Sequence, residues 1–164
     1  MLTPALIHTT EADINRMFAL DSRRRGVSPV VLLYTYSSPV LELWSDTVRQ
    51  AVWQDVNGWR EAALLYLEVS PRFFRSGSLR DHVCCLIKQC HLSVVQRSRV
   101  QNSLLHAVVK RPSVGRFRYD CRLACAVADA AFIAHLDHLA KRKGAWVGPR
   151  ARRMLKAIAQ HGSV

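Results

Sequence analysis

Residues 121–143 read CRLACAVADAAFIAHLDHLAKRK and supply the stretch on which the fold depends. Apolar side chains recur nearly all round this segment when it is wound at the helical period. Asp120 stands where it can cap the first turn, and a helix that is apolar on nearly every face is normally buried among others. The stretch therefore predicts a central helix over 121–143.

Amphipathic patterns on both sides of this segment predict further helices, over 10–22, 39–55, 59–69, 79–92, about 94–110 and 149–161. Capping-box patterns at residues 10–13 and 78–81 mark two of the starts. Residues 29–36 (PVVLLYTY) are β-branched and aromatic, which predicts one short strand. We expect a mainly α protein, a compact bundle of six or seven helices in a single domain over 1–164.

The composition is that of a folded protein with an unusual charge. Apolar residues make up 49% of the 164 residues and charged residues 22%, which excludes a wholly disordered chain. The net charge is +12, and 19 of the 24 cations are arginines. Residues 1–82 hold nine bases and nine acids, whereas 83–164 hold fifteen bases and three acids. The whole excess therefore lies in the basic half, 83–164, and the half before it is neutral.

A basic half of this kind favours an anionic partner, because clustered cations repel one another until a polyanion neutralises them. Nucleic acid is the commonest such partner, since each neutralised phosphate releases counterions. Arginine also offers a planar fork that matches phosphate and base edges. A solvated face, an acidic protein partner and an anionic membrane surface are the alternatives.

Three segments supply the candidate nucleic-acid contacts. The last predicted helix is amphipathic with a basic polar face, and it follows a basic turn. Residues 116–119 (RFRY) alternate cations and aromatic rings, a pattern that suits single strands. The helix over about 94–110 is flanked by bases. The candidate residues are Arg97, Arg99, Lys110, Arg111, Arg116, Arg118, Tyr119, Lys141, Arg142, Lys143, Arg150, Arg152, Arg153 and Lys156.

Five cysteines invite a zinc interpretation, which spacing limits. Cys121 and Cys125 share one helical face, but Cys125 and His135 would lie about 15 Å apart along a helix rising 1.5 Å per residue. They cannot share an ion at bond lengths of about 2.0–2.3 Å. Two ligands from helix 79–92 could complete a site with Cys121 and Cys125, but no C-x2-C pair presents them. We expect reduced thiols and no cofactor.

Motifs that indicate catalysis are missing from the sequence. It contains no nucleophile elbow, no P-loop and no dinucleotide-binding fingerprint. We therefore expect a non-enzymatic nucleic-acid-binding protein, with RNA slightly favoured over DNA. The alternative is a helical adaptor or inhibitor, of a viral or mobile-element accessory type, that engages an acidic protein.

The location follows from the apolar runs and the amino terminus. No run is long enough to span a bilayer, and residues 1–13 lack the basic start and apolar core of a secretory signal. We expect a cytoplasmic or nuclear protein without a membrane partner, in which a homodimer remains an option.

Overall fold

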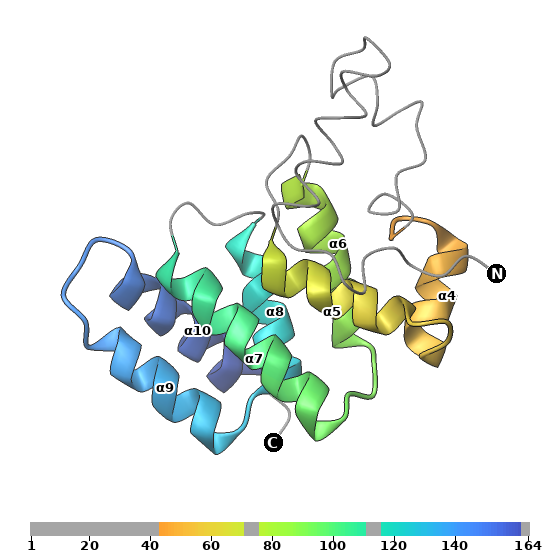
Figure 1. Ribbon diagram of the computed structural model, residues 1–164. Coiled ribbons are helices and arrows are strands. Elements are labelled where there is room, and N and C mark those ends of the chain that lie inside the picture. Colours follow the sequence, from red (N-terminus) through yellow and green to blue (C-terminus); the bar gives the residue numbers. More distant parts are fainter. Residues whose placement is uncertain (1–42, 71–75, 111–115, 162–164) are drawn as a thin grey trace, which may run out of the picture.

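The computed structural model describes residues 43–70, 76–110 and 116–161, and within them the chain is a bundle of helices (Figure 1). Seven helices are described: α4 (Asp46–Gln54), α5 (Trp59–Val69), α6 (Ser76–Lys88), α7 (Val94–Val109), α8 (Phe117–Val127), α9 (Ala130–Ala140) and α10 (Val147–His161). The predicted mainly α class is confirmed. The predicted helix 10–22, the predicted strand 29–36 and Arg111 lie outside the described residues.

The predicted central helix 121–143 is wrong as one helix, because the chain turns at Ala128. Ala128 has an extended ψ of 138° after α8, and Asp129 then caps α9 by accepting a hydrogen bond from the Phe132 amide at 2.8 Å. The Gln101 side chain on α7 donates to the Val127 carbonyl and to the Asp129 carboxylate, both at 2.8 Å. The Val127 carbonyl and the Phe132 amide, which the break frees, are thus satisfied.

The two helices that replace the single one have different surroundings. α8 lies against α6, α7 and α10, whereas α9 lies along α10 at one end of the molecule, opposite α4 (Figure 1). Leu123, Ala124 and Val127 of α8 are almost fully buried. The central position expected for the whole apolar stretch therefore belongs to α8.

Other helix limits also differ from the sequence prediction. α8 starts at Phe117, so the RFRY segment is its cap and first turn and not a preceding loop. The predicted helix 79–92 is α6, which begins earlier, at Ser76, and ends earlier, at Lys88. The predicted helix 39–55 is described only in its later part, as α4. Asp120 caps no helix, because it lies inside the bundle with 2% of its side chain exposed.

Two buried arginines, Arg80 and Arg60, tie neighbouring helices together. Arg80 donates to Asp120 at 2.9 Å and to the Leu67 carbonyl at 3.0 Å, which ties α6 to α8 and α5. Arg60 donates to the Val52 and Trp53 carbonyls, which satisfies the end of α4. These guanidiniums donate hydrogen bonds to buried oxygen atoms that water does not reach.

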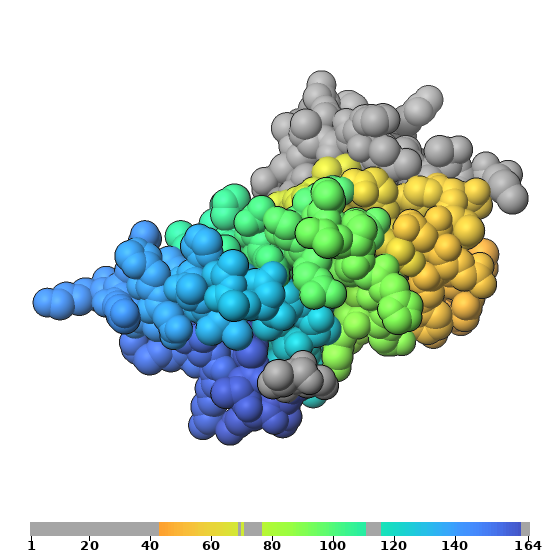
Figure 2. All heavy atoms as spheres, turned by 90° about the horizontal axis from the view of Figure 1, so that it is seen from below, coloured from red at the N-terminus to blue at the C-terminus, as the bar shows by residue number. Residues whose placement is uncertain are grey.

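The start of α10 is set by a close approach of two backbones. Gly148 is buried in the first turn, and a Cβ there would lie 2.8 Å from the Arg142 carbonyl oxygen. The missing side chain lets α10 begin directly beside the end of α9, where Arg152 donates to the Ala140 carbonyl at 2.7 Å. The short basic turn between α9 and α10 projects from one end of the molecule (Figure 2).

Candidate nucleic-acid interface

A groove of about 620 Å³ runs between α8 and α10 and reaches the end of α6. Its lining contains four Lys or Arg side chains and one histidine, but no aspartate or glutamate. We call it the basic groove, and its lining residues are Lys88, Arg118, Cys121, Arg122, Cys125, Ala126, Arg153, Ala157 and His161.

One face of α8 forms the first wall. Arg118 and Arg122 are four residues apart, as are Cys121 and Cys125, so a helix of 3.6 residues per turn brings all four to adjoining positions. The buried ion pair between Arg80 and Asp120 fixes this helix against α6. The face therefore points its cations outward and its thiols toward α10.

The second wall is α10, on which Arg153, Ala157 and His161 recur every fourth residue. The Cys125 sulfur lies 3.3 Å from the Ala157 carbonyl oxygen, so the two walls approach each other closely at this point. Lys88 closes the groove from the last turn of α6. Residues distant in sequence thus converge on one concave surface.

Tyr119 gathers arginines at the start of α8. The guanidinium carbons of Arg118, Arg122 and Arg116 lie 5.0, 5.4 and 5.6 Å from its ring centroid. Arg116 also pairs with Asp81 at 2.9 Å, so its charge is compensated. Within the described residues, Arg118 and Arg122 form no ion pair with a carboxylate. The ring therefore orders two uncompensated cations at the mouth of the groove.

The thiols of the groove are neutral at physiological pH. Burial raises the pKa of Cys121 to about 11, although the nearby Arg153 charge lowers it. Burial also raises the pKa of Cys125, with Lys88 acting in the opposite direction. Neutral thiols supply no negative charge, so the cations around them have no counter-charge within the lining.

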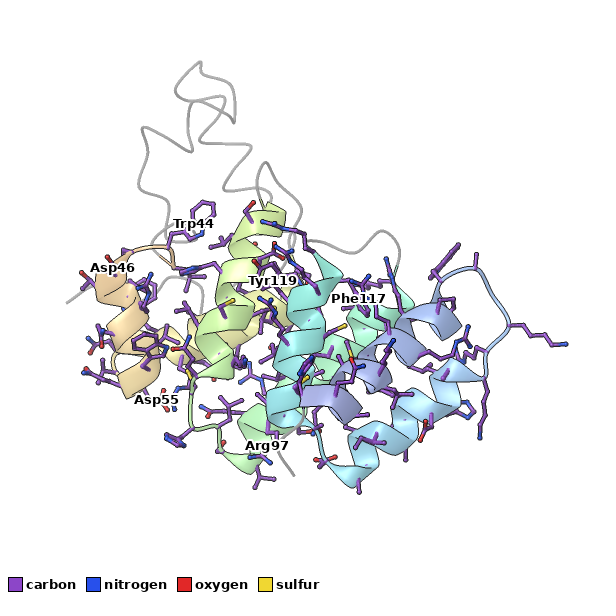
Figure 3. All side chains as sticks on the ribbon, turned by 180° about the vertical axis from the view of Figure 1, so that it is seen from behind. Trp44, Asp46, Asp55, Arg97, Phe117 and Tyr119 are labelled. Carbon is purple, nitrogen blue, oxygen red and sulfur yellow. The ribbon has the colours of Figure 1, made fainter. Side chains whose placement is uncertain are left out.

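A second hollow of about 330 Å³ adjoins the first and shares Lys88 and Ala126 with it. It adds Arg97 and His91, and its lining also lacks acidic residues. Figure 3 shows Arg97 at the end of the bundle away from Tyr119 and Phe117, which lie at the first turn of α8. The basic surface therefore continues along the length of α8.

The structure brings some of the predicted contact residues together and separates others. Arg118 and Arg153 line the basic groove, Tyr119 orders its mouth, and Arg97 lines the adjoining hollow. Lys110, Lys141, Arg142, Lys143 and Lys156 are exposed outside both hollows.

Four predicted contact residues have partners inside the protein. Arg99 pairs with Glu61 and Glu68, and Arg116 pairs with Asp81. Arg150 donates to the Lys110 carbonyl at 2.8 Å and lies over the Phe117 ring, and Arg152 donates to the Ala140 carbonyl. Through these contacts the four arginines stabilise the folded protein.

Among the Lys, Arg and His residues of the groove, three escaped the sequence analysis: Lys88, Arg122 and His161. Arg122 could have been found, because it follows Arg118 by one helical turn. His161 follows Arg153 by eight residues and lies on the same face of its helix. Lys88 gave no such signal, because its place in the groove depends on how α6 packs against α8.

The described residues contain no group of three or more histidines, cysteines or acids that could hold a metal ion. None of the described helices is long and apolar enough to cross a membrane. A comparison with protein-family models, curated proteins and solved structures finds no match to this chain.

Proposed function

We propose that the protein binds nucleic acid without catalysing a reaction and that the basic groove holds its phosphates. The observation that carries this proposal is a concave lining with four cations and no acid. Cations gathered in a hollow focus the field and attract a polyanion more strongly than the same charges spread over a convex surface.

The fate of the nearby acids supports the proposal. Asp120 pairs with Arg80 inside the bundle, and Asp81 pairs with Arg116. Asp129 caps α9 and accepts from Gln101. Within the described residues, these acids therefore interact with groups other than Lys88, Arg122 and Arg153. The positive charge of those three side chains can then interact with an external anion.

The size of the groove favours one strand over a duplex. Its volume of about 620 Å³ lies in the range of ~300–1,000 Å³ that is usual for small-ligand sites. A single nucleic-acid strand could enter such a hollow, whereas a double helix would contact only the residues at its edges. Because proteins recognise RNA mainly at single-stranded loops, bulges and ends, this geometry supports RNA over DNA.

The aromatic rings contribute less than the sequence pattern suggests. Tyr119 is half-buried among three guanidiniums, and Phe117 is half-buried beneath Arg150. Neither offers the open face that stacking on a base requires. We therefore expect binding through phosphates, which carries little sequence preference.

The first experiment measures the affinity of the full chain for a fluorescent single-stranded RNA at several salt concentrations. Four groove cations, at about 0.7 per phosphate contact for single strands, give an expected log–log slope of about 3. The measurement is repeated with DNA of the same sequence, which we expect to bind more weakly. An affinity that does not change with salt would contradict phosphate binding.

A pair of charge-reversal variants locates the site. Arg122→Glu/Arg153→Glu changes the groove, and Lys141→Glu/Lys143→Glu makes the same change in net charge on the projecting turn. We expect the groove variant to lose far more RNA affinity than the turn variant. Equal losses would show that net charge, and not the groove, governs binding.

The same variants separate nucleic acid from an acidic protein partner. If neither RNA nor DNA binds, while purified protein retains an acidic polypeptide that the groove variant releases, the adaptor alternative replaces this proposal.

A further inference from the structure

We propose that the basic groove holds the phosphate monoester at the end of a nucleic-acid strand in preference to an internal phosphodiester. This inference rests on the function proposed above and names the chemical group that the groove selects. It follows from the compactness of the charge, the charge of the ligand and the shape of the adjoining surface.

The charge of the groove is compact. Lys88, Arg118, Arg122 and Arg153 come from three helices and surround one hollow of about 620 Å³. A protein that tracks an internal backbone spreads its cations along a groove several nucleotides long. Four cations around a hollow of small-ligand size instead form a site for one highly charged group.

Two of the four cations are held in place before any ligand arrives. Arg118 and Arg122 lie 5.0 and 5.4 Å from the centroid of the Tyr119 ring, and Arg118 also donates to the Tyr119 hydroxyl at 3.3 Å. Two guanidiniums held on one ring repel each other, and an anion between them relieves that repulsion. Side chains ordered in advance also lose less entropy when they bind.

A phosphate monoester matches this charge better than a diester. An internal phosphodiester carries one negative charge, whereas a monoester carries about 1.5 to 2 near pH 7 because its second pKa is about 6. The terminal group also exposes three oxygens, which suits donors that approach from α6, α8 and α10 together. Arginine forks bind such oxygens in pairs.

The adjoining hollow accommodates the rest of the strand. It shares Lys88 and Ala126 with the groove and adds Arg97 and His91 further along the surface. A strand whose end lies in the groove can therefore continue over Lys88 and place its next phosphate near Arg97. A free nucleotide would fill the groove alone and lose the second contact.

The test compares oligoribonucleotides of one sequence that carry a 5′-phosphate, a 3′-phosphate or hydroxyls at both ends, in a fluorescence polarisation assay with the full chain. A monoester carries about 0.5 to 1 more negative charge than an internal diester. One full charge at about 4 Å in water is worth about a fivefold gain in affinity, so we expect one phosphorylated end to bind about two- to fivefold tighter. Adenosine monophosphate should compete weakly, and adenosine not at all.

Substitutions then assign the preference to the groove. Arg122→Gln should reduce the ratio of the affinities for phosphorylated and hydroxyl-ended oligonucleotides toward one. Arg97→Gln should lower the affinity for the strand and leave competition by the mononucleotide unchanged. Gln50→Glu, an exposed change on α4, which contributes no residue to the groove lining, gives the same change in net charge and should keep the ratio. Circular dichroism verifies that each variant is folded.

The outcomes separate this inference from the function on which it rests. Equal affinity for all three oligonucleotides, with a salt slope near the expected value, would overturn end recognition and leave nucleic-acid binding intact. A preference that persists in Arg122→Gln would also overturn it. If no oligonucleotide binds, both proposals fail.

Discussion

Removal of the Asp120 carboxylate should strongly destabilise the protein, because it leaves the buried Arg80 guanidinium without its counter-charge. The Arg80 and Asp120 side chains are 3% and 2% exposed, and their charged groups lie 2.9 Å apart. Burial lowers the pKa of Arg80 and Asp120 raises it, with an upward net direction. In Asp120→Ala the Arg80 side chain still keeps its charge, because an arginine guanidinium is not deprotonated in proteins, whereas a carboxyl can be protonated.

The magnitude follows from the partners that remain. In Asp120→Ala, Arg80 keeps the Leu67 carbonyl at 3.0 Å and the Ser70 hydroxyl at 2.5 Å, which are neutral acceptors. Loss of one member of a buried ion pair costs about 3–5 kcal/mol. Arg80→Met should cost less, because the Asp120 carboxyl left behind can take up a proton; its pKa is already raised by burial.

The double variant Arg80→Met/Asp120→Ala gives the sharpest measurement. Urea unfolding followed by circular dichroism yields the free energy of unfolding of the four proteins in the cycle. We expect the double variant to be more stable than Asp120→Ala alone, since it no longer buries an unpaired charge. The Leu67 carbonyl remains satisfied in this variant by the Ser103 hydroxyl at 2.8 Å.

Two results would refute this reasoning. One is a cost of less than about 1 kcal/mol for Asp120→Ala, which is the level of an exposed pair. The other is a double variant whose loss equals the sum of the single losses. Either result would mean that water reaches the Arg80–Asp120 pair and that this pair does not hold α6 and α8 together.

Three further predictions concern the turns and the thiols. Gly148→Ala should lower the unfolding free energy by about 1–3 kcal/mol, measured by thermal melting, because its Cβ would lie 2.8 Å from the Arg142 carbonyl oxygen. The Gln101 hydrogen bond lowers the pKa of Asp129, so the stabilising effect of this carboxylate is complete above its ordinary value of 3.8 and is lost as the pH falls through the lower folded value. The melting temperatures of the wild type and Asp129→Ala should therefore differ at pH 7 and converge near pH 2; a constant gap would contradict this. Cys121 should resist alkylation at pH 7.5 and react as the pH approaches its pKa of about 11, which peptide mass spectrometry can follow; rapid reaction at pH 7.5 would exclude a buried neutral thiol.

The helices could be predicted from sequence more readily than their breaks. α5 and α7 match their predicted spans because apolar periodicity and turn residues mark both ends. The break at Ala128 was hidden because alanines and apolar residues continue the helical pattern through it. Aspartate is a residue type that caps helices, but the pattern could not show that Gln101 on another helix would stabilise a turn at Asp129.

The site could be predicted only as a property of the basic half. Charge counting located the excess cations but could not show which of them have internal partners. Arg99 binds glutamates on α5, and Arg150 reaches carbonyls on α7, contacts that depend on tertiary packing. Helical spacing joins Arg118 to Arg122, yet the approach of α10 and α6 to that face exists only in the folded chain.

The outer position of α9 has a consequence for how this chain can change over evolutionary time. The walls of the basic groove come from α6, α8 and α10, and α9 supplies none of its lining. Substitutions on the exposed face of α9 are therefore free to accumulate, as long as its buried residues still pack on α10 and the Arg142 carbonyl keeps its close approach to Gly148. Sequence divergence among relatives should concentrate on that face of α9, while the face of α8 changes slowly.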